Sequence, residues 1–479
     1  MLLIILLLPA AIAVFCGLQR GDLCPGAYRV MAAAQAAVTL LCGAAALRGG
    51  YETPLFHLTD TLTFSLRTDA MGGLFAVLTA VFWLLSIPYS SVYMKHEHGE
   101  PGFFCFLFLT ESAMLGAAFA GDMMTLYLFF ELTTLCSAPL VLHSRTGKAL
   151  MGAGKYLYFS MAGAFAVLFG MAVVFSQGGT LVFAKGGVLS GGGPLLLLAA
   201  FCMILGFSTK AGLYPMHAWL TAAHPVAPAP ASALLSGIIT KVGVLGVIRT
   251  VYFLVGPGLL QGTWVQHWLL LMALLTVFMG SLMAASENGL KKRLAFSSIS
   301  NLSYVLLGVF LMTPLGLVGA LLQLLFHAMA KIGIFQCAGT CILLTETDTL
   351  DGFRGLGKRI PVTMLCFTLF ALSLVGIPPF GGFYSKWYLA LAGLSAIPGP
   401  LRYAIPAVLL ASALLTAVYL FWPLTRAFFP GRGFPAPQRV REPRRMLLPM
   451  VLLSALCLVL GILHPAVTRV MEGIAAAIL

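Results

Sequence analysis

TKAGLYPMHAWLTAAHPVAPAPASALLSGIITKVGVLGVIRT, residues 209–250, begins inside one apolar run, passes through a segment rich in glycine and proline, and ends inside a second apolar run. Proline removes a backbone donor and clashes with the preceding turn, so a helix over 195–222 should break near Pro215. In lipid such a break is tolerated only where the freed backbone groups are buried in protein or line a hydrated cavity. The stretch therefore predicts a broken membrane helix beside a polar pathway.

A second long apolar run, 361–394, is interrupted in the same way by GIPPFGG at 376–382. Paired interrupted helices at corresponding places are typical of inverted-repeat transporters, whose sites lie near the breaks. We therefore expect two inverted five-helix repeats, each containing one broken helix. The expected divisions are N-terminal transmembrane helices over 1–100, a first repeat over 101–253, a second repeat over 254–428, and a C-terminal loop with one transmembrane helix over 429–479.

The composition supports a chain that lies almost wholly in a membrane. Of its 479 residues, 60% are hydrophobic and only 9% charged, and the mean hydropathy is +0.98. Soluble domains carry roughly a quarter charged residues. We predict an all-α integral membrane protein with about 14 transmembrane helices. The expected spans are 2–18, 29–47, 69–93, 102–119, 123–142, 155–176, 195–222, 232–252, 267–285, 294–312, 315–344, 361–394, 404–428 and 446–463.

The net charge of +13 comes from short basic clusters between apolar runs, which favours positive loops beside spans over nucleic-acid binding. If successive loops are assigned to alternate sides of the membrane, one side holds most of the lysines and arginines. They include Lys291–Arg293, Arg354–Arg359 and Arg426–Arg445. By the positive-inside rule this side is cytoplasmic. We therefore predict a multi-pass protein of a prokaryotic inner (plasma) membrane with both termini outside.

The sequence offers no ligand set for a cofactor or metal. The ten cysteines form no CxxC pair and no cluster with histidine at metal-ligand spacing. There is no GxxxxGK[ST] loop for phosphates. We predict no bound cofactor, no metal and no redox centre within the chain.

Ionisable residues in the middle of apolar spans are the strongest functional signal. Each costs roughly 2.5 to 3.5 kcal/mol on insertion scales and usually pairs or lines a pathway. Six stand out, namely Glu131, Lys210, Lys241, His327, Lys331 and Lys386. A lysine taken out of water loses its preference for the charged form, and a nearby carboxylate restores it. A Glu131–Lys210 pair that closes and opens could therefore switch a proton.

His327 and Lys331 are four residues apart and share one helix face, where two positive charges would repel. That spacing favours passing one proton over holding two. Each buried charge has a plainer alternative as half of a static ion pair between helices. Glu111 is equally compatible with proton access and with an interhelical contact, while His217 and His224 sit by the first break and suit loop packing or support. The run Arg439–Arg445 suits a topology signal and a surface for anionic lipid or a neighbouring subunit.

Five stretches resemble the antiporter-like subunits shared by respiratory complex I, membrane-bound hydrogenases and Mrp-type sodium/proton antiporters. They are GDMMTLYLFFELTTLCSAPLV (121–141), the 209–250 stretch, KKRLAFSSISNLSYVLLG (291–308), LFHAMAKIGIFQCAG (325–339) and LVGIPPFGGFYSKW (374–387). They occur in the family's order, and the resemblance runs from about residue 100 to 425.

The resemblance implies a fourteen-helix fold and assigns roles by matching position. Glu131 and Lys210 would serve the first half-channel, Lys241 the connection, His327 and Lys331 the central relay, and Lys386 the end of the second half-channel. The implied partners are other membrane subunits, including further antiporter-like subunits and a redox module, with H+ and Na+ as the candidate ions. Some complex I relatives carry glutamate where this chain has Lys386.

The sequence leaves rival functions open. The first alternative is a subunit of an Mrp-type sodium/proton antiporter without a redox partner, and the second is a membrane scaffold whose buried charges are static. A quinone-reducing enzyme in its own right is disfavoured because no redox ligand set is visible. We therefore expect a non-catalytic, proton-translocating subunit of an oxidoreductase complex.

Overall fold

The computed structural model describes residues 1–59, 62–189, 191–346, 348–396, 398–431 and 438–479. In these residues twelve helices are long and apolar enough to cross a membrane. They are α2 (Pro25–Leu47), α3 with its 3-10 extension η1 (Ala70–His96), α4 (Glu100–Ala118), α5 (Met123–Val141), α6 (Gly147–Gly178), α7 (Pro194–Ala211), the continuous helix Ala229–Val255, α12 (Trp264–Ser286), α13 (Leu290–Phe310), α14 (Pro314–Thr345), α18 (Ala404–Phe428) and α19 (Arg444–Ile462).

Two further apolar helices are shorter, α1 (Leu2–Gly17) and α16 (Pro361–Val375). Every segment expected to span the membrane therefore contains a helix, and the helical membrane fold is confirmed. The number of crossings, 14, stays a prediction, because only twelve helices of the described chain qualify by length and composition.

Several helices begin where a short polar side chain satisfies the first free amides of the helix. Asp69 accepts a hydrogen bond from the Gly72 amide before α3, and Asp122 accepts one from the Thr125 amide before α5. Thr313 caps α14 in the same way. Such caps accept hydrogen bonds from backbone N–H groups of the first helical turn, for which lipid offers no acceptor.

The two expected breaks are present. Helix α7 ends at Ala211, Gly212 turns the chain in the left-handed region at φ +78°, and α8 (Ala218–Val226) resumes. Helix α16 is closed by Gly376, with φ +87°, and α17 (Gly381–Ala396) resumes. Glycine adopts this backbone conformation without the steric cost that a Cβ brings.

Packing repeats in the same order in two parts of the chain. Helix α4 packs on α5, α5 on α6, α6 on both α7 and α8, and α7 on α10. Likewise α12 packs on α13, α13 on α14, α14 on both α16 and α17, and these two on α18. The repeated order supports the expected repeats, whose boundaries and inverted relation stay predictions.

The helical bundle carries one small sheet that the sequence did not predict. Strands β1 (Glu52–His57) and β2 (Thr63–Arg67) form an antiparallel hairpin. It is anchored to the bundle by backbone hydrogen bonds from Arg67 N to Phe119 O (2.6 Å) and from Gly121 N to Ser65 O (2.9 Å). These partners lie more than fifty residues along the chain, so the short strands gain their support from a distant loop.

The C-terminal region holds a further helix beyond the expected one. After α19 the chain continues into α20 (His464–Ile478), which buries Thr468, Met471, Ala475 and Ile478 and exposes most of its remaining residues. Helix α20 packs on α14 and α3. The short connecting helices are α11 (Pro257–Leu260), η4 (Leu350–Phe353), α15 (Leu356–Arg359) and η5 (Pro400–Tyr403).

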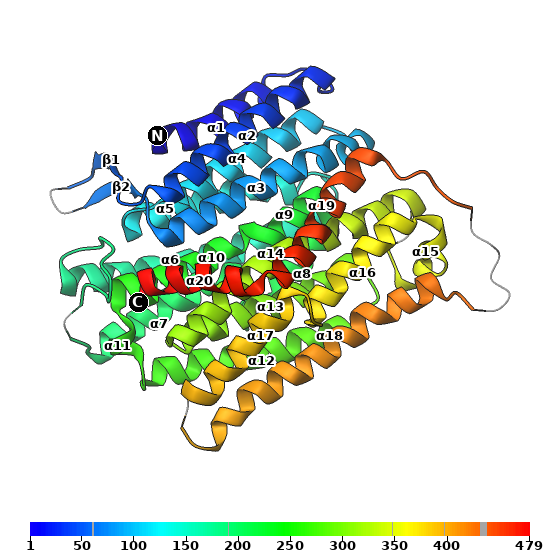
Figure 1. The fold of residues 1–479 in the computed structure, drawn as a ribbon. Coiled ribbons are helices and arrows are strands. Elements are labelled where there is room, and N and C mark those ends of the chain that lie inside the picture. The colour runs from blue at the N-terminus through cyan, green and yellow to red at the C-terminus, as the bar shows by residue number, and fades with distance from the viewer. Residues whose placement is uncertain (60–61, 190, 347, 397, 432–437) are drawn as a thin grey trace.

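The bundle has two chemically different ends (Figure 1). We call the end with β1, β2 and the loop 180–189 the hairpin face. The opposite end, which holds Lys291–Arg293 and Arg439–Arg445, is called the basic face. Both termini lie at the hairpin face, where Lys185 Nζ donates to Ala476 O (2.9 Å). Which face meets the cytoplasm stays a prediction.

Candidate functional site

The first predicted pair lies between α5 and α7. Lys210, in the last turn of α7, is buried, and its Nζ donates to Thr134 Oγ1 (2.7 Å) and to Phe130 O (3.2 Å). The ammonium also lies 4.7 Å from the centre of the Phe130 ring. Glu131 occupies the same stretch of α5, and its Oε1 has no hydrogen-bond partner among the described residues. No ion pair within 4.0 Å joins Glu131 to Lys210 in the described chain. The two groups therefore interact electrostatically without direct contact.

Lys241 follows a local change of helix type. The helix Ala229–Val255 consists of α9 (Ala229–Leu234), the π-helical turn η2 (Leu235–Ile239), α10 (Lys241–Ile248) and a second π segment, η3 (Arg249–Val255). Lys241 Nζ donates to Ser236 O (2.5 Å), inside η2. The Ser236 hydroxyl is 2.6 Å from the Ser298 hydroxyl of α13. Because π turns are frequent at functional sites, this irregularity agrees with the predicted connecting role.

The central pair lies on α14. Lys331 is buried and its Nζ donates to Leu294 O (3.0 Å) on α13. His327 is also buried, and neither ring nitrogen has a hydrogen-bond partner among the described residues. It lies within electrostatic range of Lys241, Lys331 and Lys386. An imidazole with both nitrogens open can accept a proton on one side and release it from the other.

Lys386 is held at the second break. Its Nζ donates to Leu374 O (2.6 Å) and Val375 O (2.8 Å), the last carbonyls of α16. The ammonium lies 5.4 Å from the centre of the Tyr304 ring. The C-terminal end of a helix carries partial negative charge, so α16 itself supplies the counter-charge for Lys386. We call Lys210, Lys241, His327, Lys331 and the partly buried Lys386 the buried line.

Polar residues that the sequence reasoning missed lie between His327 and Lys386. Gln323, one helical turn before His327, donates to Asn301 Oδ1 (3.1 Å) and accepts from Ser385 Oγ (2.6 Å). Ser385 is the neighbour of Lys386 in sequence. Glutamine and asparagine inside apolar helices could have indicated these residues from the sequence, because a buried uncharged polar group also needs a hydrogen-bond partner.

The three supporting candidates have different surroundings. Glu111 is buried on α4 and accepts a hydrogen bond from the Gln35 side chain of α2, which is an interhelical contact. His217 lies at the first break and stacks on Tyr214, with ring centres 5.7 Å apart. His224 is buried and stacks on Phe335 at 5.0 Å, close to the Lys331 side of α14.

No group of three or more histidine, cysteine or acidic side chains in the described residues could hold a metal ion. All ten cysteines lie in the described residues and are free, and Cys24 is the exposed one. The side chains of the buried line and their partners supply amines, imidazole, hydroxyls and amides.

Comparison with known proteins identifies the family of the chain. Residues 120–422 match the family described as NADH:quinone oxidoreductase/Mrp antiporter, TM. The chain belongs to this family. It is a multi-pass, antiporter-like membrane subunit, as the resemblance in the sequence implied.

Its relatives include both redox and antiporter proteins. The chain is 32% identical over 421 residues to the N subunit of NADH-quinone oxidoreductase from Desulforudis audaxviator, covering 83% of this chain and 81% of the relative. It is 30% identical over 402 residues to the D subunit of a Na(+)/H(+) antiporter from Alkalihalophilus pseudofirmus, covering 83% and 80%. These relatives belong to multisubunit membrane assemblies.

The fold also matches a chain in the structure of the membrane-bound sulfane sulfur reductase, an archaeal respiratory membrane complex. The TM-score is 0.87 at 22% identity, covering 100% of this chain and 97% of that chain. At this identity the likeness concerns the fold alone.

Proposed function

We propose that the chain translocates protons as one member of a multisubunit membrane complex, by a relay along the buried line. The observation that carries this proposal is the arrangement of four lysines and one histidine across both repeats. Each lysine amine is bonded to carbonyl or hydroxyl oxygens. Such partners hold an ammonium more weakly than a carboxylate does, so the proton can leave.

The Glu131–Lys210 pair is the proposed switch. In the separated arrangement Lys210 is held by Thr134, whereas approach to Glu131 would favour the charged amine. Moving one elementary charge through 100 mV involves about 2.3 kcal/mol. A tenfold to hundredfold change in the proton affinity of a lysine is worth about 1.4 to 2.7 kcal/mol. Opening and closing of the pair is therefore of the right size to drive the step.

Protons suit the buried line better than sodium. A metal cation needs several oxygen ligands in one place, whereas ammonium groups and a neighbouring imidazolium would repel it. The similarity to the N subunit of NADH-quinone oxidoreductase supports a redox partner. The alternative is an Mrp-type sodium/proton antiporter without a redox partner, which the comparable similarity to the D subunit of the Na(+)/H(+) antiporter supports.

The test is ion pumping by the native complex reconstituted in liposomes, with Lys210→Ala compared with the wild type. We expect Lys210→Ala to abolish pumping. The matched control is Lys155→Ala, since Lys155 is exposed on α6 and should leave pumping unchanged. Electron transfer and sodium-driven proton exchange are recorded together, because a coupled redox reaction supports the first proposal and exchange alone the alternative. Undiminished pumping by Lys210→Ala would favour the scaffold interpretation.

A further inference from the structure

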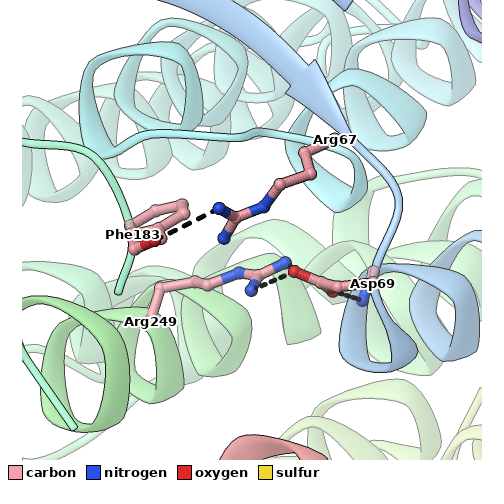
Figure 2. A network of polar contacts seen from close by, with 5 residues as sticks. Arg67, Asp69, Phe183 and Arg249 are labelled. Atoms are coloured by element: carbon pink, nitrogen blue, oxygen red, sulfur yellow. Dashed lines mark hydrogen bonds and ion pairs between the residues drawn. The ribbon is translucent and has the colours of Figure 1, made fainter. Parts of the chain in front are cut away.

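An ion pair between Arg249 and Asp69 lies near the end of strand β2 (Figure 2). Arg249 has a fully buried side chain, and its two terminal nitrogens bind both oxygens of Asp69 at 2.6 and 2.9 Å. The guanidinium also lies 5.0 Å from the Phe183 ring centre and 4.8 Å from that of Phe253. Asp69 retains 23% side-chain exposure, so the pair reaches from the protein interior to the surface.

Three segments distant in sequence meet at this pair. Asp69 caps α3, Arg249 begins η3, and Arg67 at the end of β2 donates to Phe183 O (3.2 Å) in the loop that follows α6. That loop is fixed to η3 by backbone hydrogen bonds, including Ala184 N to Phe253 O (3.0 Å). Hydrogen bonds thus join the surroundings of the pair at the end of β2, in the loop after α6 and in η3.

The three charged groups of this cluster do not cancel. Arg67 and Arg249 both lie near the single carboxylate of Asp69, which leaves one net positive charge among the three. Burial disfavours the charged form of Asp69, but the Arg249 charge and its hydrogen bonds hold the pKa of Asp69 below its ordinary value. The carboxylate therefore stays ionised and the pair intact at neutral pH.

Arg249 lies on the same continuous helix as Lys241, eight residues further towards the hairpin face. At a rise of 1.5 Å per residue the separation is about 12 Å. A fixed positive charge between a proton-carrying lysine and the solvent of that face opposes the passage of protons, as arginine does in pores that exclude cations.

We propose that Arg249 is an electrostatic barrier that isolates Lys241 and the buried line from the solvent at the hairpin face. This inference rests on the proposed proton relay. Arg249 is a positioning residue in this scheme, because it acts on protons through its fixed charge and exchanges none itself. Asp69 anchors the arginine and keeps it from turning towards solvent, while Arg67 offsets the charge of the carboxylate.

The net positive charge of Arg67, Arg249 and Asp69 together, rather than the ion pair as such, sets the barrier. A unit charge about 12 Å away at an effective dielectric constant of about 20 changes proton occupancy about tenfold. We therefore expect passive proton conductance to rise about tenfold when that charge is removed. A purely structural pair would instead make both partners equally sensitive, through loss of folding or assembly.

The experiment measures passive proton leak into liposomes that contain the assembled complex without substrate, under an imposed pH gradient. Four variants are compared with the wild type: Arg249→Met, Arg249→Lys, Asp69→Asn and the double variant Arg249→Met with Asp69→Asn. We expect about a tenfold rise in leak in Arg249→Met and none in the other three, because the double variant retains one net positive charge through Arg67. Only complexes that assemble at wild-type levels are scored, and the double variant separates loss of the ion pair from loss of the net positive charge.

Adding Lys241→Met to Arg249→Met should remove the leak if protons pass along the buried line. A leak in Asp69→Asn or in the assembled double variant as large as that in Arg249→Met would overturn the barrier, because both variants lose the ion pair but keep a net positive charge. A leak that survives Lys241→Met would overturn its connection to the line. The assay needs no turnover, so it is decided independently of whether Lys210→Ala abolishes pumping.

Discussion

Buried amines that must release protons need partners of intermediate strength. Lys210 has one neutral hydroxyl, Thr134 Oγ1, and one carbonyl, Phe130 O, as acceptors. A carboxylate in direct contact would hold the ammonium as a static pair, whereas no partner at all would make its charge too costly. The proposed switch therefore depends on the Thr134 hydroxyl, which accepts a hydrogen bond from Lys210 in the separated arrangement.

Replacing Thr134 by valine removes this acceptor at nearly constant volume. A hydrogen bond to a charged group contributes about 1.5–3 kcal/mol, so the population of the separated, charged Lys210 should fall about tenfold or more. We expect proton pumping to fall by a similar factor, measured in liposomes with electron transfer or exchange recorded alongside. Thr133→Val is the matched control, because the Thr133 hydroxyl bonds to Phe129 O of its own helix. Equal effects of the two substitutions would contradict this role.

The broken helices join local sequence signals to the site. Gly376 closes α16 in the left-handed region, and the carbonyls released there bind Lys386. The break thus creates both the acceptor and the space for the lysine. The shape of one element and the chemistry of one residue therefore depend on the same glycine.

Gly376→Ala should impair both stability and pumping. An alanine in the left-handed region costs about 1–2 kcal/mol, and its Cβ would lie 3.2 Å from Lys386 Cδ. Gly179→Ala is the control, since Gly179 follows α6 at φ +67° with nothing within 4 Å of an added Cβ. Both variants should unfold more readily in thermal denaturation of the purified complex, but only Gly376→Ala should lose pumping. Loss of pumping in Gly179→Ala as well would refute the local explanation.

Elements with strong local signals were predictable from the sequence. Pro215 and the GIPPFGG stretch predicted the two breaks, and long apolar runs predicted the helices. The anchoring of the hairpin and the Asp69–Arg249 pair could not be predicted, because both depend on partners distant in sequence. Arg249 and Asp69 are separated by 180 residues. Four of the six expected charges are buried, whereas Glu131 and Lys386 are partly buried. Oxygens that hold the lysines, such as Ser236 O and Leu294 O, are backbone groups with no sequence signature.

At the scale of the whole molecule, the distribution of charge and the path of the chain define two opposite faces. The basic loops gather at one end, and the hairpin with both termini lies at the other (Figure 1). Since positive loops face the cytoplasm, the hairpin and the termini should face outside. The Arg249 barrier would then separate the buried line from the outer solvent.

A native cysteine makes this orientation measurable. Cys24 is exposed between α1 and α2, where the adjacent Leu23 amide bonds to Glu100 at the start of α4 on the basic side. A membrane-impermeant maleimide should therefore modify the wild type in inside-out vesicles and spare it in right-side-out vesicles. Replacing Cys24 by serine should abolish this rapid labelling, because exposed thiols react fastest.

Adding Leu58→Cys to the Cys24→Ser background places a thiol at a residue of the hairpin face that is 55% exposed. This variant should be labelled only in right-side-out vesicles. Reversal of both patterns would place the basic face outside and contradict the positive-inside prediction. Labelling of both thiols from the same side would contradict the opposition of the two faces, on which the direction of the proposed barrier depends.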